Sequence, residues 1–292
     1  MSNPFLFEKR DTMGKIALVL EGGGMRGAYT AGVIDCLIKN NIEVDVCYGV
    51  SAGAINACSY ISKQYGRSFA ILTHDSKGKM GSLKKLFTTG NYLDNDFLYD
   101  VLPNEVYPLD KKTFDKSKTK FYAVITNVET GEAEYPLIKD MDKDNILIRA
   151  SASLPIVSRF VPINNNWYLD GGLVDSIPVK KAFDDGADKC LVILTRQNGY
   201  VKKKSSSLWL VKIKYHRYPK LVEAIRERHN IYNKTLEYIK HKKEEKKCLV
   251  IQPKEPVKVG RLEKDINKIK KLYDDGFNDA LEMMDQIKNF IK

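Results

Sequence analysis

The sequence predicts an α/β protein with a mainly parallel sheet, because its N-terminal part alternates strand and helix patterns. A short run of strand-forming residues at 15–20 is followed by a glycine-rich loop and a segment with helical spacing. A second apolar run, at 42–50, leads through a sharp turn into a helix of small and apolar residues. Strand, helix, strand and helix in this order form a βαβ unit, whose strands are parallel.

The central part of the chain continues this pattern after an irregular stretch. Residues 75–118 carry short apolar groups separated by Gly, Asp, Asn and Lys, and we expect an insertion over the top edge of the sheet. Whether that insertion forms a lid is left open. Residues 121–138 predict a hairpin that turns at ETGE. The segment NILIRASASLP predicts a helix that ends at Pro155.

The elements that follow surround the sequence DGG. Residues 167–179 begin as a strand that breaks at Gly171 and Gly172. The next segment, KKAFDDGA, predicts a short helix, and residues 188–195 predict another buried strand. Beyond residue 200 the patterns are mainly helical, with one short strand expected at CLVIQP.

Charge is distributed unevenly between the two parts of the chain. The net charge is +11, and all of it falls after residue 200, where 24 basic residues face 13 acidic ones. We therefore expect a boundary near residue 200, with one domain at 1–200 and a basic, mainly helical extension at 201–292. An anionic partner should contact the extension.

Composition places the protein among soluble globular chains. Of its 292 residues, 43% are hydrophobic and 29% are charged, which is enough apolar material for a sizeable core. The N-terminus has no apolar run of signal-peptide length, and no stretch approaches the roughly 18 apolar residues of a spanning helix. A cytoplasmic location is expected. The widely spaced cysteines predict buried free thiols, and no residue cluster has the spacing of a metal site.

The pentapeptide GVSAG carries a candidate nucleophile, Ser51. Its G-x-S-x-G pattern is typical of a serine at a sharp turn between a strand and a helix. Gly49 and Gly53 supply the small neighbours that such a nucleophile elbow needs, and the N-terminus of the following helix favours negative charge. A buried serine in a tight strand–helix turn is the alternative interpretation.

The loop GGGMRG at 22–27 follows the first strand and allows two interpretations. Its spacing matches a dinucleotide-binding loop, but such a loop expects an acidic residue at the end of the second strand, and that strand ends in Val50 and Ser51. The other interpretation is an oxyanion hole built from the backbone N–H groups of Gly23, Gly24 and Met25. Arg26 would anchor the loop or meet a phosphate. A plain flexible turn is the third alternative.

A serine nucleophile needs a base, and the four histidines are poorly placed to serve. His216, His229 and His241 fall in charged helical segments, and His74 is expected near the end of the helix after the elbow. Asp170 is the best carboxylate, since it ends an apolar strand beside two glycines that let the backbone turn. Its ordinary pKa of about 3.9 makes it a weak base, which burial would improve.

Together, GGGMRG, GVSAG and DGG, with the segment ASASLP before the last, resemble the patatin-like phospholipase family. The resemblance covers about residues 15–195. It implies a three-layer α/β/α fold and a Ser–Asp dyad that hydrolyses fatty acyl esters of lipids without a cofactor. Ser51 would then be the nucleophile and Asp170 the base. The oxyanion hole would lie in the loop formed by Gly22, Gly23, Gly24, Met25, Arg26 and Gly27. Residues 260–280 resemble the helical extension of a bacterial cytoplasmic branch of the family.

Two further functions compete with a serine acyl-hydrolase. One is a catalytically silent lipid-binding scaffold on the same fold, and the other is a dinucleotide-dependent oxidoreductase. Residues 201–220 carry seven basic residues and no acidic one, together with Trp209 and leucines, so they predict contact with an anionic membrane at its inner face. No nucleic-acid partner is expected, and the oligomeric state is left open.

Overall fold

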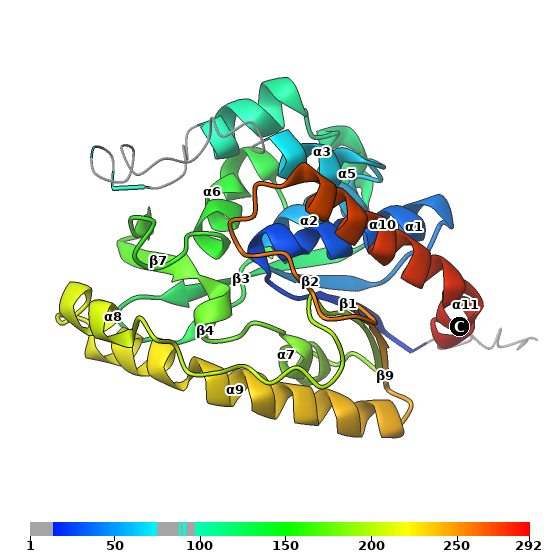
Figure 1. The fold of residues 1–292 in the computed structure, drawn as a ribbon. Helices are drawn as coiled ribbons and strands as arrows, with labels where there is room; N and C mark the ends of the chain where they lie inside the picture. Colours follow the sequence, from blue (N-terminus) through cyan, green and yellow to red (C-terminus); the bar gives the residue numbers. More distant parts are fainter. Residues whose placement is uncertain (1–13, 75–87, 89, 92–96) are drawn as a thin grey trace, which may run out of the picture.

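One central sheet organises the molecule (Figure 1). The computed structural model describes residues 14–74, 88, 90, 91 and 97–292. Within them the strand order is β6-β7-β3-β2-β1-β8-β9, and β4 and β5 pair with β3. The strands are β1 (Ile16–Leu20), β2 (Val46–Val50), β3 (Lys120–Asn127), β4 (Ala133–Glu134), β5 (Leu137–Ile138), β6 (Val161–Ile163), β7 (Asn166–Asp170), β8 (Lys189–Ile193) and β9 (Cys248–Ile251).

The middle of the sheet is parallel, as the sequence predicts. Strand β1 pairs in parallel with β2 and β8, β2 pairs in parallel with β3, and β8 with β9. The hairpin expected after β3 is also present, since β4 and β5 run antiparallel to it. Strand β7 then pairs with β3 in the antiparallel sense. As a result, Asp170 at the end of β7 lies beside Ile125 in β3.

Helices cover both faces of the sheet and complete the three expected layers (Figure 1). One layer holds α1 (Gly27–Lys39), α2 (Ala52–Ile61), α3 (Arg67–His74), the helix η3 (Phe97–Val106), α5 (Lys111–Lys116), α6 (Met141–Ser151), α10 (Ile266–Glu282) and α11 (Met284–Phe290). The opposite layer holds α7 (Val179–Asp184), α8 (Leu208–Lys214) and α9 (Pro219–Glu244). Within the described residues, no helix is both long and apolar enough to cross a membrane.

The hydrophobic core lies on both faces of the sheet, and alternate side chains of β1 belong to each side. Leu18 and Leu20 belong to the hydrophobic cluster that includes α1, α2 and α10, whereas Ala17 and Val19 belong to the cluster beneath α7 and α9. Successive side chains of a strand point to opposite faces, so a fully buried strand reads as a continuous apolar run. The five cysteines are buried and unpaired, as predicted.

The C-terminal residues are closely integrated with the rest of the fold. Strand β9 extends the sheet beside β8, and α10 packs tightly on α1. A Cβ atom on Gly32 would lie 2.0 Å from the carbonyl oxygen of Tyr273, and one on Gly276 would lie 2.2 Å from that of Tyr29. The glycines therefore let the two helix backbones touch. A domain boundary near residue 200 remains a prediction. Strands β8 and β9 lie on opposite sides of that boundary in the sequence and pair in the same sheet.

Two expected boundaries differ from the structure. The helix after Ser51 ends at Ile61, so His74 lies at the end of the separate helix α3. Helix α6 ends at Ser151, four residues before the proline taken as its stop. The expected insertion at 75–118 lies partly outside the described residues; its described part forms η3 and α5.

Candidate active site

Ser51 occupies a sharp turn between β2 and α2. Its backbone has φ 56° and ψ −122°, a conformation that side-chain-bearing residues avoid and that costs about 1–3 kcal/mol. The flanking glycines permit this turn. A Cβ atom on Gly49 would lie 2.7 Å from the Cα of Ala54, and one on Gly53 would lie 2.4 Å from the carbonyl oxygen of Leu20. The side chain of Ser51 therefore stands at the N-terminus of α2, at the carboxyl edge of the sheet.

Asp170 ends β7 at a second tight turn. A Cβ atom on Gly171 would lie 2.2 Å from the carbonyl oxygen of Val124, so only glycine fits there. The N–H of Gly172 donates a hydrogen bond of 2.7 Å to Oδ1 of Asp170. The turn thus fixes one carboxylate oxygen through its own backbone, and the other oxygen remains for a further donor.

The segment ASASLP holds both candidate residues in place. The N–H of Ser51 donates to Oγ of Ser151 at 2.9 Å, and the N–H of Asp170 donates to the carbonyl oxygen of Ser153 at 2.8 Å. The Ser51 side chain lies close enough to the Asp170 carboxylate to lower its pKa. The two side chains expected to act together are therefore adjacent in the structure.

The surroundings of Asp170 tune its basicity in two directions. Burial raises the pKa of this carboxyl above its usual value, because the charged form loses its hydration. The Ser51 side chain, the charge of Arg228, the N–H of Gly172 and the charge of Arg261 act in the opposite sense. The net effect is a raised pKa, which makes Asp170 a better base than an exposed aspartate.

The glycine-rich loop lies beside Ser51 at the same edge of the sheet. Gly24 has a φ of 58°, in the left-handed region that glycine tolerates. The N–H of Met25 donates to the carbonyl oxygen of Arg261 at 3.1 Å, so one of the three expected oxyanion donors is engaged. The hydrogen bonds of the described residues give no acceptor for the N–H groups of Gly23 and Gly24. These two groups are the remaining candidate donors.

The other residues of this loop have packing roles. A Cβ atom on Gly22 would lie 3.2 Å from Cβ of Ser51, and one on Gly27 would lie 2.8 Å from Cβ of Ala52. Both glycines therefore allow the loop to approach the elbow. Arg26 is buried, and its Nε has no hydrogen-bond partner among the described residues. Burial, reinforced by neighbouring arginines, lowers its pKa to about 10.

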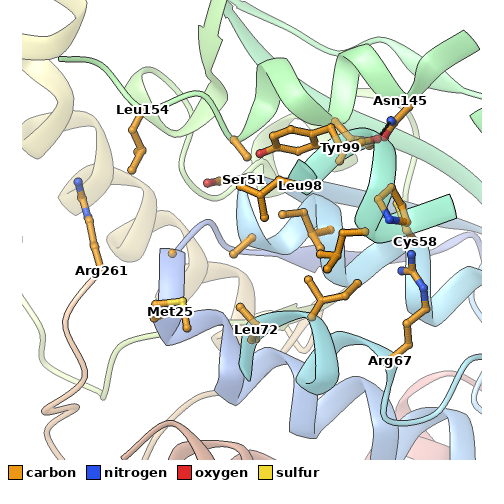
Figure 2. A pocket seen from close by; sticks show the side chains of 18 of the residues that line it. Met25, Ser51, Cys58, Arg67, Leu72, Leu98, Tyr99, Asn145, Leu154 and Arg261 are labelled. Atoms are coloured by element: carbon orange, nitrogen blue, oxygen red, sulfur yellow. Dashed lines mark hydrogen bonds between the residues drawn. The ribbon is translucent and has the colours of Figure 1, made fainter. Parts of the chain in front are cut away.

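A mainly apolar pocket extends from Ser51 (Figure 2). Its volume is about 170 Å³, and α2, α3, η3 and α6 supply most of its wall. Apolar lining residues include Ile55, Ile71, Leu72, Leu98, Leu102, Leu109, Met141, Ile148 and Leu154. Residues 261–264, which precede α10, close one side of the pocket. An elongated apolar group can lie in this pocket with its polar end at Ser51.

None of the four histidines lines this pocket. His74 stacks on Phe97 and contacts Tyr107, while His216 and His241 are exposed. His229 lies beside the carbonyl oxygen of Arg226 on the outer layer. Asp170, by contrast, is a titratable group that lies beside Ser51.

Sequence reasoning missed two arginines that reach the site from the C-terminal residues. Arg228 donates from Nε to the carbonyl oxygen of Gly172, next to the candidate base. Arg261 lies against the glycine loop and lines the pocket; Figure 2 shows its side chain at the left, apart from Ser51. Arg228 is not among the candidate residues that the sequence predicts. Its position on the buried stripe of α9 was the available signal.

The chain is similar to known proteins over most of its length. The model of the patatin-like phospholipase family matches residues 18–183, and a domain of unknown function matches residues 218–292. The chain is 36% identical over 192 residues to the uncharacterized protein YjjU of Escherichia coli, which covers 62% of this chain and 52% of that protein. It is 27% identical over 196 residues to the probable lipid hydrolase 463L of Invertebrate iridescent virus 6, covering 61% and 66%.

Among solved structures, VipD from Legionella pneumophila matches with a TM-score of 0.45 and 11% identity, covering 94% of this chain and 67% of that one. The chain spans about half the length of the Escherichia coli relative. The family model covers more than half of the chain and includes the glycine loop, the Ser51 elbow and the Asp170 turn. The chain therefore belongs to the patatin-like phospholipase family.

Proposed function

We propose that this protein is a serine acyl-hydrolase that cleaves fatty acyl esters of lipids. One observation carries the proposal: Ser51 stands on a strained turn, beside the buried carboxylate of Asp170 and at the end of an apolar pocket. Strain that the surrounding structure maintains at a reactive side chain is typical of functional sites. Membership of a phospholipase family and the relative named as a lipid hydrolase support the same reaction class.

In the proposed mechanism, Asp170 is the general base and later the general acid. It accepts the Ser51 proton as Oγ attacks the acyl carbonyl, and it then returns this proton to the leaving alcohol. The acyl group stays bonded to Ser51 until water attacks, with Asp170 accepting a proton from that water. The raised pKa of Asp170 favours both transfers, because it brings the carboxyl closer to the operating pH.

The negative charge that develops on the carbonyl oxygen needs donors near Ser51. We assign this role to the N–H groups of Gly23 and Gly24, which have no other acceptor among the described residues. Such preorganised donors are worth about 3–4 kcal/mol each in a site that excludes water. Met25 is a weaker candidate while its N–H remains bonded to Arg261.

The pocket predicts a preference for long acyl chains, because each buried methylene gains about 0.8 kcal/mol. Ile55, on α2 and half-buried, lines the pocket next to Ser51. The substitution Ile55→Trp should narrow the pocket and lower kcat/KM for p-nitrophenyl decanoate at least about tenfold more than for the butyrate. The measurement is hydrolysis of the ester series by wild type and variant. Equal losses for both esters would show that the acyl chain lies elsewhere.

Contact with an anionic membrane is a second part of the proposal, carried by α8. Its outward side chains include Trp209 and Ile213, which are 61% and 66% exposed, and Lys212 lies between them in the sequence. Apolar side chains mixed with lysines suit the interface of an anionic bilayer. Lys202 does not belong to this surface, because it packs 3.9 Å above the Tyr232 ring and burial lowers its pKa to about 7.

Helix α8 is also joined to the rim of the pocket. The N–H of Ile156 donates to the hydroxyl oxygen of Tyr215 at 2.8 Å, and Nζ of Lys214 donates to the carbonyl oxygen of Ile156 at 2.9 Å. Leu154, two residues earlier, lines the pocket. A membrane bound at α8 would therefore lie beside the segment that borders the candidate active site.

Removing the apolar side chains of α8 should weaken membrane binding. We expect the double substitution Trp209→Ala and Ile213→Ala to reduce partitioning onto phosphatidylglycerol vesicles by at least about 100-fold, since two apolar side chains together contribute about 3–6 kcal/mol on burial. Co-sedimentation measures the change. Leu281→Ala is the matched control, because Leu281 is 50% exposed on α10 in the other layer. Hydrolysis of the soluble butyrate ester should stay unchanged in both variants, and unchanged partitioning would remove α8 as the docking element.

A further inference from the structure

Arg228 is a half-buried cation on the side of α9 that faces the rest of the fold. It lies on α9 among the buried positions of that helix, between Ile225 and Tyr232. Its Nε donates to the carbonyl oxygen of Gly172, and an added Cβ on Gly172 would lie 3.5 Å from its Nη2. The guanidinium therefore contacts the second glycine of the turn whose N–H binds Asp170.

We propose that Arg228 is a positioning residue for the reaction, which fixes the Asp170 turn and keeps the carboxylate charged and ready to accept the Ser51 proton. This inference rests on the proposed function, because it assumes that Asp170 is the base. Arg228 lies outside the part of the chain that the patatin-like phospholipase model matches. The C-terminal part would then complete the active site rather than merely pack against it.

The geometry supports a backbone contact and a charge effect that act together. The carbonyl oxygen of Gly172 accepts from Arg228 while the N–H of the same residue donates to Asp170. The peptide groups of the turn are thus held between the cation and the carboxylate. A nearby opposite charge favours the ionised form of a buried acid, which otherwise loses hydration. Arg228 accordingly opposes the effect of burial on the pKa of Asp170.

Three other groups that lie near Asp170 interact with it in different ways. Ser51 lowers its pKa through its side chain, and Arg261 adds a weaker favourable charge from the segment before α10. Burial raises the pKa of Tyr99 in η3, and the nearby charge of Asp170 adds to this rise. Among these neighbours, Arg228 combines charge with a direct hydrogen bond to the DGG turn.

The neighbours of Arg228 indicate that its charge can be removed without unfolding the protein. Lys202 and Arg261 are cations within its electrostatic reach. Burial, together with the charge of Arg261, lowers the pKa of Arg228 to about 10. Glu21 is already bound, because Tyr232 and Thr195 donate hydrogen bonds to its carboxylate. A neutral side chain at position 228 would relieve repulsion between cations and leave Glu21 with these donors.

The test is the pH dependence of kcat/KM for Arg228→Gln, Arg228→Met and Arg228→Lys with p-nitrophenyl butyrate. Without the cation, the pKa of Asp170 should rise, so the carboxylate becomes protonated at a higher pH than in the wild type. The acidic limb of the pH profile of kcat/KM should therefore shift to higher pH. We expect the ratio of activity at pH 6 to that at pH 8 to fall by about tenfold in both neutral variants. Arg228→Lys keeps the charge and should keep the wild-type limb, even if the lost fork geometry lowers the rate.

Arg226→Gln is the matched control, since Arg226 lies two residues away on α9 and pairs with Glu223 at the surface. Its pH profile should equal that of the wild type. A neutral variant that loses activity equally at every pH would overturn the charge role of Arg228. Asp170→Asn in the same series separates the two proposals. If it remains active, the base assignment fails and this inference fails with it; if it is inactive and the limb is unshifted, only the role of Arg228 fails.

Discussion

Alanine at position 51 is expected to lower ester hydrolysis by at least about 10⁴-fold. Without Oγ no acyl-enzyme forms, and catalysis that remains after loss of a nucleophile comes from binding and oxyanion donors alone. Hydrolysis of p-nitrophenyl esters measures the loss. A fluorophosphonate probe followed by peptide mass spectrometry should place a single adduct on Ser51 of the wild type and none on the variant.

The matched control for this change is Ser62→Ala. Ser62 lies at the C-terminal end of α2, where its hydroxyl donates to the carbonyl oxygen of Cys58, outside the pocket lining. Its replacement should leave labelling and hydrolysis intact. Folded wild-type protein that takes up no probe would contradict the hydrolase proposal and favour the lipid-binding scaffold.

Asparagine in place of Asp170 is the second large change, with an expected loss of about 10³–10⁴-fold in kcat. The amide keeps the size of the side chain, and its oxygen can still accept the N–H of Gly172. It cannot take the Ser51 proton. The variant should therefore fold and bind ester, with a similar KM, while turnover is lost. Steady-state kinetics and a thermal melt distinguish these effects.

The wild type should also show this carboxyl in its pH profile. Burial raises the pKa of Asp170, and only the carboxylate is a base, so kcat/KM should fall as the pH drops through that raised value. Asp175→Asn provides the control. Asp175 is a second buried carboxyl near the turn, but it accepts hydrogen bonds from Tyr135 and the N–H of Ile177. If Asp170→Asn and Asp175→Asn lowered kcat/KM equally, buried charge in this region would matter for folding rather than for proton transfer.

The local parts of the site can be predicted from sequence because short-range sterics dictate them. A strained elbow demands small residues on both sides, so Gly49 and Gly53 identify the turn at Ser51 without any tertiary information. The apolar runs at 16–20 and 189–193 likewise predict buried strands, since a strand covered on both faces has no polar alternation.

Contacts between distant segments cannot be predicted in this way. The carbonyl oxygen of Arg261 accepts a hydrogen bond from the N–H of Met25, which is far away in the sequence. No local sequence pattern predicts such a contact. Arg228 is an intermediate case, because its place on the stripe of Leu221, Ile225 and Tyr232 is visible in the helical period. The contact that Arg228 makes with the DGG turn, however, is not visible in that period.

The pairing of β9 with β8 has a consequence for how the chain is made. Strand β8 ends at Ile193, but its partner β9 begins only at Cys248. At the usual synthesis rate of about 5–20 residues per second, the edge of β8 therefore stays unpaired for several seconds. Unpaired apolar edges recruit strands from other chains. We therefore expect the ribosome-bound intermediate to be prone to aggregation through this edge until β9 has been translated.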